Sequence, residues 1–432
     1  MKFGKTAKLA ILTSIIVIPP VAAQTGRVTL KPINVGAISA ERLDVRRFPS
    51  VMMPGAKTPQ KRTGGAATWA KIDPKVANAV QANLTAQMLA NAIKKKLAGK
   101  SIGFAVTVMT QSGGKGTAVG GLARSAPDGG QRGWSPSDRI TVASVSKSFS
   151  AAAMMRVMAS KGVGINTKIG PYLPASWTAG ANFKDISFAQ LMNHTSGIRG
   201  GGTCSITNDG LKGCAAKGVA IADKTYLYQN ENAAMLRILL PRVYGNSPVS
   251  EADYAKDYEV IVNRMVMNSA GIPYATCKAG AGNVSMSYES TTDNGQDGAP
   301  QNAAAVNFDW TSVKPGIDWG DMSAYCGSQG WNLSSDDLAK FAHALAFTDR
   351  ILPQASVNTM RDNSLGLFYS DFGGGLDGYG HNGWHPAGWN QGEINTWSFS
   401  FNKGVSIGLV INSRYNGSYS NDVAAAVKEV LP

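Results

Sequence analysis

A helix that is apolar on nearly every side is the feature that most constrains how this chain can fold. Residues 149–158 are mostly Phe, Ala, Met and Val, and Gly162 follows them as a typical helix stop. A helix without a polar face has to be surrounded by other elements. With 432 residues, 44% of them hydrophobic, the chain is long enough to supply those elements. We therefore expect a central, buried helix inside a globular domain.

Ser144 and Lys147 stand at the start of this helix in the pattern S-x-x-K. Residues three apart lie on one helix face, which brings the amine close to the hydroxyl. Unpaired backbone N–H groups at a helix start stabilise the anion that forms when a serine attacks a carbonyl. If Ser144 only capped the helix, a costly buried lysine would be left without a reason. The pattern favours Ser144 as a nucleophile and Lys147 as the amine that activates it.

The same pattern occurs twice more, in contexts that do not suit this chemistry. Ser112 lies in a Gly-rich turn, and Ser400 lies in a segment of alternating aromatic and serine residues that is typical of a strand. Neither position is followed by a helical turn that would place the lysine beneath the serine. The helical context therefore selects Ser144.

Strands and helices are expected at both ends of the chain, around a mostly helical and loop-rich middle. The predicted elements are a helix over 74–98, a strand over 102–108, a hairpin with strands over 397–401 and 405–411, and a helix over 421–431. Alternating apolar residues on both sides of a short turn indicate antiparallel pairing. The sequence thus predicts an α/β (α+β) domain with an antiparallel sheet and no internal repeat.

Residues 1–23 have the three regions of a secretory signal: a basic start, an apolar stretch over 9–18, and a small-residue cleavage site at Ala23. The apolar stretch is too short to span a bilayer, and no later run has spanning length. We expect this segment to be removed and the protein to be secreted or periplasmic.

Residues 24–75 form a basic extension before a domain that we place at 76–432. The extension holds ten Lys or Arg against three acidic residues and so carries much of the formal net charge of +14. A charge-rich stretch of this kind is typically a solvated linker. Contact with an anionic cell envelope is the alternative that stays open, and no further feature supports a nucleic-acid partner.

Four cysteines in an exported chain predict disulfides. Three pairings are possible, of which Cys204–Cys214 with Cys277–Cys326 is the simplest. A zinc site is disfavoured because no C-x-x-C or H-E-x-x-H spacing occurs and the four histidines lie apart from the cysteines. We expect neither a metal nor another cofactor. Residues 278–328 form a long polar segment without periodicity, which we expect to border a functional site.

Further motifs follow Ser144 in a fixed order. They are ASVSKSF at 143–149, GPYLP at 170–174, ISFAQLMNHTSG at 186–197, YQN at 228–230, GWNLSSDDL at 330–338 and HNG at 381–383. Together they resemble the class C branch of the serine β-lactamase and penicillin-binding-protein family, over residues 76–432. The resemblance implies a β-lactamase/transpeptidase-like fold, in which an antiparallel sheet flanked by helices is joined to a mostly helical subdomain.

The resemblance also implies a catalytic apparatus. Ser144 would attack the substrate, and Lys147 with Tyr228 would handle its proton. Both are poor bases at their free pKa values near 10, so at least one must be shifted by its surroundings. Which of the two is the base stays open at this point. His194 is expected to be architectural.

The same resemblance implies the substrate contacts. Asn230 would orient the acyl side chain, Gly383 belongs to the third motif, and the backbone N–H groups of Ser144 and Trp384 would hold the oxyanion. His381, the fourth expected catalytic residue, departs from the β-lactamases, which carry lysine there to meet a carboxylate. We therefore expect a hydrolase of small esters or D-amino-acid amides; a D,D-peptidase or a penicillin-binding sensor is the alternative, and a weak β-lactamase is disfavoured.

Overall fold

A computed structural model describes residues 79–280, 285–288, 316–385 and 392–431 of the chain. The predicted signal at 1–23, the basic extension at 24–75 and the first residues of the helix predicted from 74 lie outside this range. The polar segment at 278–328 is described only at its two ends and at 285–288.

The sheet is antiparallel and has seven strands in the order β3-β2-β1-β9-β8-β7-β6. The strands are β1 (Gly103–Thr110), β2 (Lys115–Arg124), β3 (Arg132–Gly133), β6 (Phe368–Asp371), β7 (Asp377–His385), β8 (Ile394–Phe401) and β9 (Val405–Ile411). The predicted hairpin is the pair β8 and β9, with Phe401 opposite Val405. The strand predicted at 102–108 is β1, which pairs with β9 from the other end of the chain. The expected antiparallel sheet is confirmed.

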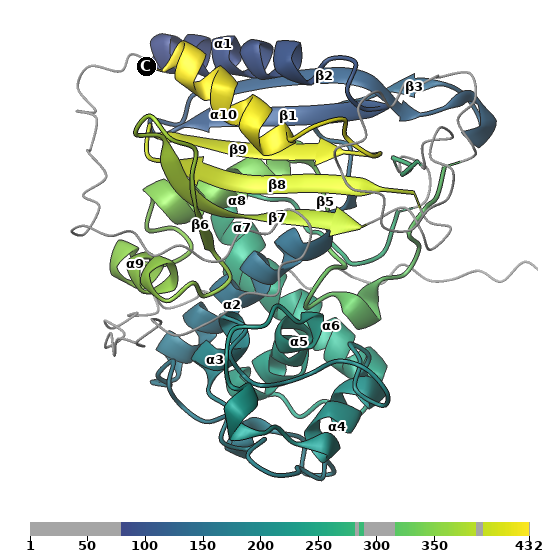
Figure 1. The fold of residues 1–432 in the computed structure, drawn as a ribbon, viewed down its shortest axis with the longest axis vertical. Coiled ribbons are helices and arrows are strands. Elements are labelled where there is room, and N and C mark those ends of the chain that lie inside the picture. Colours follow the sequence, from purple (N-terminus) through teal and green to yellow (C-terminus); the bar gives the residue numbers. More distant parts are fainter. Residues whose placement is uncertain (1–78, 281–284, 289–315, 386–391, 432) are drawn as a thin grey trace, which may run out of the picture. The chain divides into compact units, whose positions relative to one another are not determined.

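Two helices cover one face of this sheet (Figure 1). They are α1 (Ala79–Leu97) and α10 (Tyr419–Val430), which come from opposite ends of the described chain and pack against each other. The strand residues beneath them are large and apolar, as Phe399 and Leu409 illustrate. The residues between this face of the sheet and the two helices therefore form a separate hydrophobic core.

The other face of the sheet is lined by small and polar residues, which let helix α8 (Ser335–Phe347) approach closely. A Cβ at Gly408 would lie 2.0 Å from the carbonyl oxygen of Ser335. The hydroxyls of Ser398 and Ser400 donate to the carbonyls of Leu338 and Ala342 at 3.0 and 3.2 Å. The alternation of aromatic and serine residues along β8 thus assigns the aromatic side to α1 and α10 and the serine side to α8.

The middle of the chain forms the helical part. Its elements are β4 (Ile140–Thr141), α2 (Ser146–Ser160), α3 (Phe188–Met192), α4 (Asn208–Lys217), α5 (Asn230–Tyr244), α6 (Glu251–Val262), which continues as a π-helix over Asn263–Met267, α7 (Asn268–Ala270), β5 (Asn332–Leu333) and, after α8, α9 (Gln354–Asp362). Figure 1 shows α2 between the sheet and the helices α3, α4 and α5. All residues of α2 from Ser146 to Met155 are buried, as the apolar pattern predicts.

Both disulfides have the sequential pairing. Cys204 bonds to Cys214 across 10 residues, and Cys277 bonds to Cys326 across 49. The second bond links the two ends of the polar segment at 278–328. Among the residues that the structure describes, no helix is long and apolar enough to cross a membrane.

Candidate active site

Ser144 lies in a short 3₁₀ turn, Ala143–Val145, that leads directly into α2. Ala143 has a φ of 47°, a left-handed conformation that is costly for a residue with a side chain. Two strands support this turn. The hydroxyl of Thr396 on β8 donates to the carbonyl of Val142 at 2.7 Å, and Gly383 on β7 packs so closely that a Cβ there would lie 2.2 Å from the same oxygen. The sheet thus fixes the strained turn that presents Ser144.

Lys147 reaches Ser144 as the helical spacing predicts. Its Nζ donates to Ser144 Oγ at 2.8 Å and to the carbonyl oxygen of Ser328 at 2.9 Å. The side chain is only 2% exposed. Burial lowers the pKa of Lys147 to about 7, and the carboxylate of Glu231 opposes that shift only in part. A large fraction of this amine is therefore neutral near pH 7 and able to accept a proton.

Tyr228 lies close to the same amine. Its ring centroid is 5.0 Å from Lys147 Nζ, and its hydroxyl is hydrogen-bonded to Ser144. Burial raises the pKa of Tyr228 above its ordinary value. The phenol therefore stays protonated at neutral pH, and of the two candidate bases Lys147 is the one that its surroundings prepare for the task.

His194 supports Tyr228 and does not touch the nucleophile. Its ring stacks on the Tyr228 ring at 4.4 Å between centroids, and its Nδ1 accepts a hydrogen bond from the backbone of Gln229 at 3.1 Å. Burial lowers the pKa of His194 well below its usual value, so the ring is neutral. This is the architectural position that the motif around residues 186–197 implies.

His381 and Gly383 lie on the part of β7 that faces the nucleophile turn. Strand β6 pairs with β7 only as far as Gly380, and beyond it no strand in the described ranges covers this edge. His381 is 3% exposed, and its Nε2 has no hydrogen-bond partner among the described residues. Burial, and then the positive charge of Lys147, lower the pKa of His381 to about 3. The third motif therefore presents a neutral imidazole to the site.

Asn230 and Trp384 are the two remaining residues of the predicted site. Asn230 is the first residue of α5, and its buried Oδ1 has no partner within the part of the chain that the structure describes. Trp384 alternates with Gly383 on β7, and its indole donates to Glu393 at 3.1 Å. Its side chain is held away from the nucleophile, which leaves its backbone as the part that can serve the site.

Three contacts of the site escape prediction from sequence. The carbonyl of Ser328 and the hydroxyl of Thr396 act on Lys147 and on the nucleophile turn from 181 and 254 residues away. Glu231 follows the Y-x-N motif directly, but nothing in that spacing shows that its carboxylate acts on Lys147. The sequence predicts that the polar segment at 278–328 borders a functional site, and Ser328 at its end contacts Lys147.

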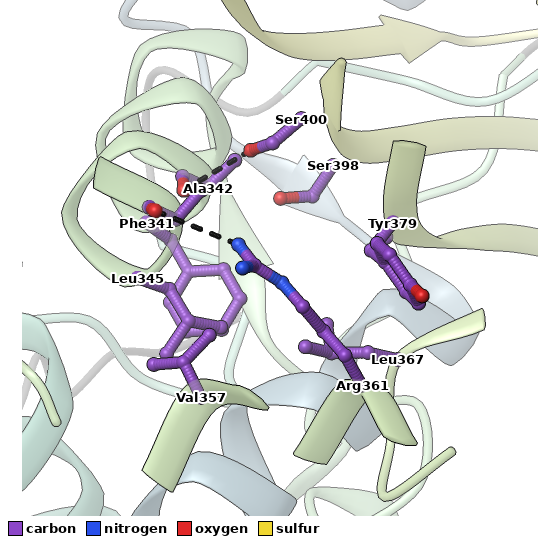
Figure 2. A pocket seen from close by; sticks show the side chains of 11 residues that line it. Phe341, Ala342, Leu345, Val357, Arg361, Leu367, Tyr379, Ser398 and Ser400 are labelled. Carbon is purple, nitrogen blue, oxygen red and sulfur yellow. Dashed lines mark hydrogen bonds between the residues drawn. The ribbon is translucent and has the colours of Figure 1, made fainter. Parts of the chain in front are cut away.

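A small cavity lies beside the candidate site and is distinct from it (Figure 2). It has a volume of about 20 Å³ and lies between α8, α9 and β7, next to His381 at Gly380. The guanidinium of Arg361 extends into it and lies 5.6 Å from the ring centroid of Tyr379. The space suits about one water molecule and is too small for a substrate.

The fold and the Ser–Lys–Tyr arrangement together define a protein of the β-lactamase/transpeptidase fold. Residues 89–431 match the beta-lactamase family, and the chain belongs to this family. A comparison with curated proteins found no match.

Solved structures agree on the fold. D-amino acid amidase from Ochrobactrum anthropi SV3, complexed with L-phenylalanine amide, matches with a TM-score of 0.61 at 16% identity, over 80% of this chain and 99% of the other. A D-stereospecific amidohydrolase from Streptomyces sp. matches with a TM-score of 0.56 at 18% identity, over 79% and 98%. FmtA from Staphylococcus aureus matches with a TM-score of 0.56 at 13% identity, over 82% and 90%.

Proposed function

We propose that this protein is an exported serine hydrolase that forms an acyl-enzyme at Ser144 and cleaves an ester or the amide of a small or D-configured amino acid. The observation that carries this is the hydrogen bond of 2.8 Å between Lys147 Nζ and Ser144 Oγ, in a setting where burial lowers the pKa of Lys147 to about 7. A neutral amine in contact with a hydroxyl is the arrangement that activates a serine.

The residues divide the acylation step between them. Ser144 Oγ attacks the substrate carbonyl carbon while its proton passes to Lys147 Nζ. The carbonyl oxygen becomes an oxyanion, which the backbone N–H groups of Ser144 and Trp384 would receive. When the tetrahedral intermediate collapses, the bond to the leaving oxygen or nitrogen breaks. The phenol of Tyr228, hydrogen-bonded to Ser144, is placed to give that atom a proton and to recover one from Lys147.

Hydrolysis of the acyl-enzyme reverses these roles. Water attacks the ester carbon, its proton passes to Lys147, and Ser144 Oγ leaves with a proton. The amide oxygen of Asn230, buried and without a partner among the described residues, would accept a hydrogen bond from the acyl portion during both steps.

The substrate class rests on two supports. The neutral His381 stands where a cation would be needed to hold a carboxylate, so an uncharged ester or amide fits better than a β-lactam. Several structural neighbours are named as enzymes acting on D-amino acid amides or with D-stereospecificity. Export is supported by the two disulfides, which persist in oxidising compartments.

Covalent labelling tests the nucleophile. Purified protein should react with a fluorophosphonate probe, and intact mass should increase by one adduct that maps to Ser144. The Ser144→Ala variant should not react, whereas Ser112→Ala, at another S-x-x-K sequence, should label as the unchanged protein does. Equal labelling of the Ser144→Ala variant would refute the proposal.

A substrate panel then separates the proposed hydrolase from its alternative. We expect turnover of p-nitrophenyl butyrate or D-alanyl p-nitroanilide, with little hydrolysis of a cephalosporin. A D,D-peptidase or penicillin-binding sensor would instead retain a fluorescent penicillin for hours without releasing product. The mass of the trapped acyl-enzyme distinguishes these outcomes directly.

A further inference from the structure

Phe368 is an aromatic residue beside the site that neither the sequence motifs nor the proposed mechanism uses. It is the first residue of β6 and pairs with Gly380, the last residue of β7 that β6 covers on this edge. Its ring centroid lies 4.9 Å from that of His381 and 6.4 Å from that of Tyr228. The rings of Tyr228 and His381 are themselves 6.3 Å apart. These separations are those of aromatic pairs in contact, so the three rings form one cluster, in which Tyr228 is hydrogen-bonded to Ser144.

The segment before Phe368 is anchored to two helices of the site. The hydroxyl of Ser148 on α2 donates to the carbonyl of Gly366 at 2.6 Å. The backbone N–H of Gly366 donates to the carbonyl of Met192, the last residue of α3, at 3.0 Å. Gly366 has a φ of 68°, which favours glycine, and a Cβ there would lie 2.5 Å from the Cβ of Ala151. Phe368 is therefore held at a fixed place relative to the helix that carries the Ser–Lys pair.

Part of the aromatic cluster remains in contact with solvent. His381 and His194, whose ring lies 6.3 Å from that of Phe368, are each 3% exposed. Phe368 and Tyr228 are only half-buried. The accessible part of the cluster thus consists of the phenol that takes part in the proposed reaction and, packed on it, a purely apolar ring. Covering such a ring with another apolar group is favourable.

The rings that pack on Phe368 are neutral near pH 7. Burial lowers the pKa of His381 to about 3 and that of His194 well below its usual value. Burial raises the pKa of Tyr228, which therefore keeps its proton. A neutral aromatic surrounding of this kind favours an uncharged, apolar group over a charged one.

We propose that Phe368 is a substrate-binding residue that packs against an aromatic or other apolar leaving group. The proposal rests on the proposed function, in which Tyr228 gives the leaving atom its proton and so lies on that side of the scissile bond. The leaving group is then next to the ring that packs on Tyr228, whereas the acyl portion meets Asn230. Aromatic rings attract each other in tilted or offset arrangements. A benzyl group gains this contact, and a methyl group in its place does not.

Two esters that differ only in the leaving group test this inference. The benzyl and methyl esters of N-acetyl-D-alanine release alcohols of similar acidity, so their intrinsic reactivities are close. We expect kcat/KM of the unchanged protein to be larger for the benzyl ester by about 3- to 10-fold, the value of about one aromatic pair.

Substitutions at position 368 assign the preference. Phe368→Ala should bring the benzyl-to-methyl ratio of kcat/KM close to one, and Phe368→Tyr, which keeps a ring, should preserve it. Phe368→Leu fills a similar volume without a ring and should lower the ratio, which keeps the test valid if the alanine variant does not fold. If Phe368 only supported the fold, its loss would slow both esters alike and leave the ratio unchanged.

Phe372→Ala is the matched control. Phe372 lies four residues further along the chain and is likewise half-buried. Its ring packs on Trp397 and Phe399, on the face of the sheet that α1 and α10 cover. This variant should keep the ratio of the unchanged protein.

The proposal is overturned if the unchanged protein does not prefer the benzyl ester, if Phe368→Ala or Phe368→Leu keeps the full preference, or if Phe368→Tyr or Phe372→Ala loses it. If neither ester is hydrolysed, the Ser144→Ala protein is titrated calorimetrically with the corresponding benzylamide and methylamide, and equal or absent binding overturns it. The failure of the proposed function has a different signature, since it appears as fluorophosphonate labelling that does not depend on Ser144.

Discussion

At the scale of single residues, the chemistry of the site depends on how its surroundings change Lys147. An ordinary lysine is almost fully protonated at pH 7 and cannot take the proton of a serine. Burial of Lys147 disfavours its charged form, and the hydrogen bonds to Ser144 and Ser328 leave the amine in place when it is neutral. Tyr228 is shifted in the opposite direction, which makes it a proton donor at the same pH. The environment thus suits Lys147 as the proton acceptor and Tyr228 as the proton donor of the proposed mechanism.

If Lys147 is the base and Tyr228 the acid, kcat/KM should depend on pH in a particular way. Because acylation needs neutral Lys147, kcat/KM for p-nitrophenyl butyrate should rise with pH through a midpoint near 7, the lowered pKa of this amine. Tyr228→Phe should reduce kcat/KM by about 100-fold or more but leave the midpoint in place. If Tyr228 were the base, the rising limb would lie far above pH 9. A limb that disappears in the Tyr228→Phe variant would contradict the assignment to Lys147.

At the scale of elements, the site depends on how closely β7 and β8 approach the turn before α2. Gly383 allows this approach, because a Cβ at that position would lie 2.2 Å from both Thr396 Oγ1 and the carbonyl oxygen of Val142. Both atoms also form the hydrogen bond that supports the turn. The sheet and α2 therefore meet at a point where even one methyl group is too large.

Gly383→Ala should consequently displace the nucleophile turn. We expect a loss of about 1–3 kcal/mol in the free energy of unfolding from overpacking, and a fall in the rate of fluorophosphonate labelling of at least 10-fold. Gly133→Ala, on β3 of the same sheet, is the control, since its Cβ would meet nothing closer than 3.9 Å. Thermal unfolding measures the stability of the two variants, and the kinetics of fluorophosphonate labelling measure the reactivity of Ser144 in each. Similar effects at both positions would argue against a special role for Gly383.

Sequence patterns predict this level of structure well where the relevant residues are close together in the chain. The S-x-x-K spacing brings Lys147 next to Ser144 because residues three apart lie on the same face of one helical turn. The alternation of apolar residues along 397–411 likewise predicts the strands β8 and β9. The matches at Ser112 and Ser400 fail because those residues lie in the turn after β1 and on β8. Contacts such as Lys147 with Ser328 depend instead on a backbone carbonyl far along the chain, which no side-chain pattern identifies.

At the scale of the whole molecule, the two disulfides close loops of different lengths and should therefore stabilise the folded chain by different amounts. Cys204–Cys214 closes a short loop at α4, whereas Cys277–Cys326 closes a loop across 49 residues. The entropy lost by the unfolded chain grows with loop length, so the longer loop should contribute about 4 kcal/mol and the shorter one about 3 kcal/mol. Only the longer loop would also affect the proposed catalysis, because Ser328 follows Cys326 by two residues and its carbonyl accepts a hydrogen bond from Lys147.

Removing the two bonds separately should therefore have different consequences. Cys277→Ser with Cys326→Ser should lower both the melting temperature and kcat/KM, because the freed segment no longer holds the Ser328 carbonyl against Lys147. Cys204→Ser with Cys214→Ser should lower the melting temperature somewhat less and leave kcat/KM close to its original value. Thermal unfolding and p-nitrophenyl butyrate hydrolysis of the two double variants give the comparison. If kcat/KM falls equally in both, general destabilisation and not the position of Ser328 accounts for the loss.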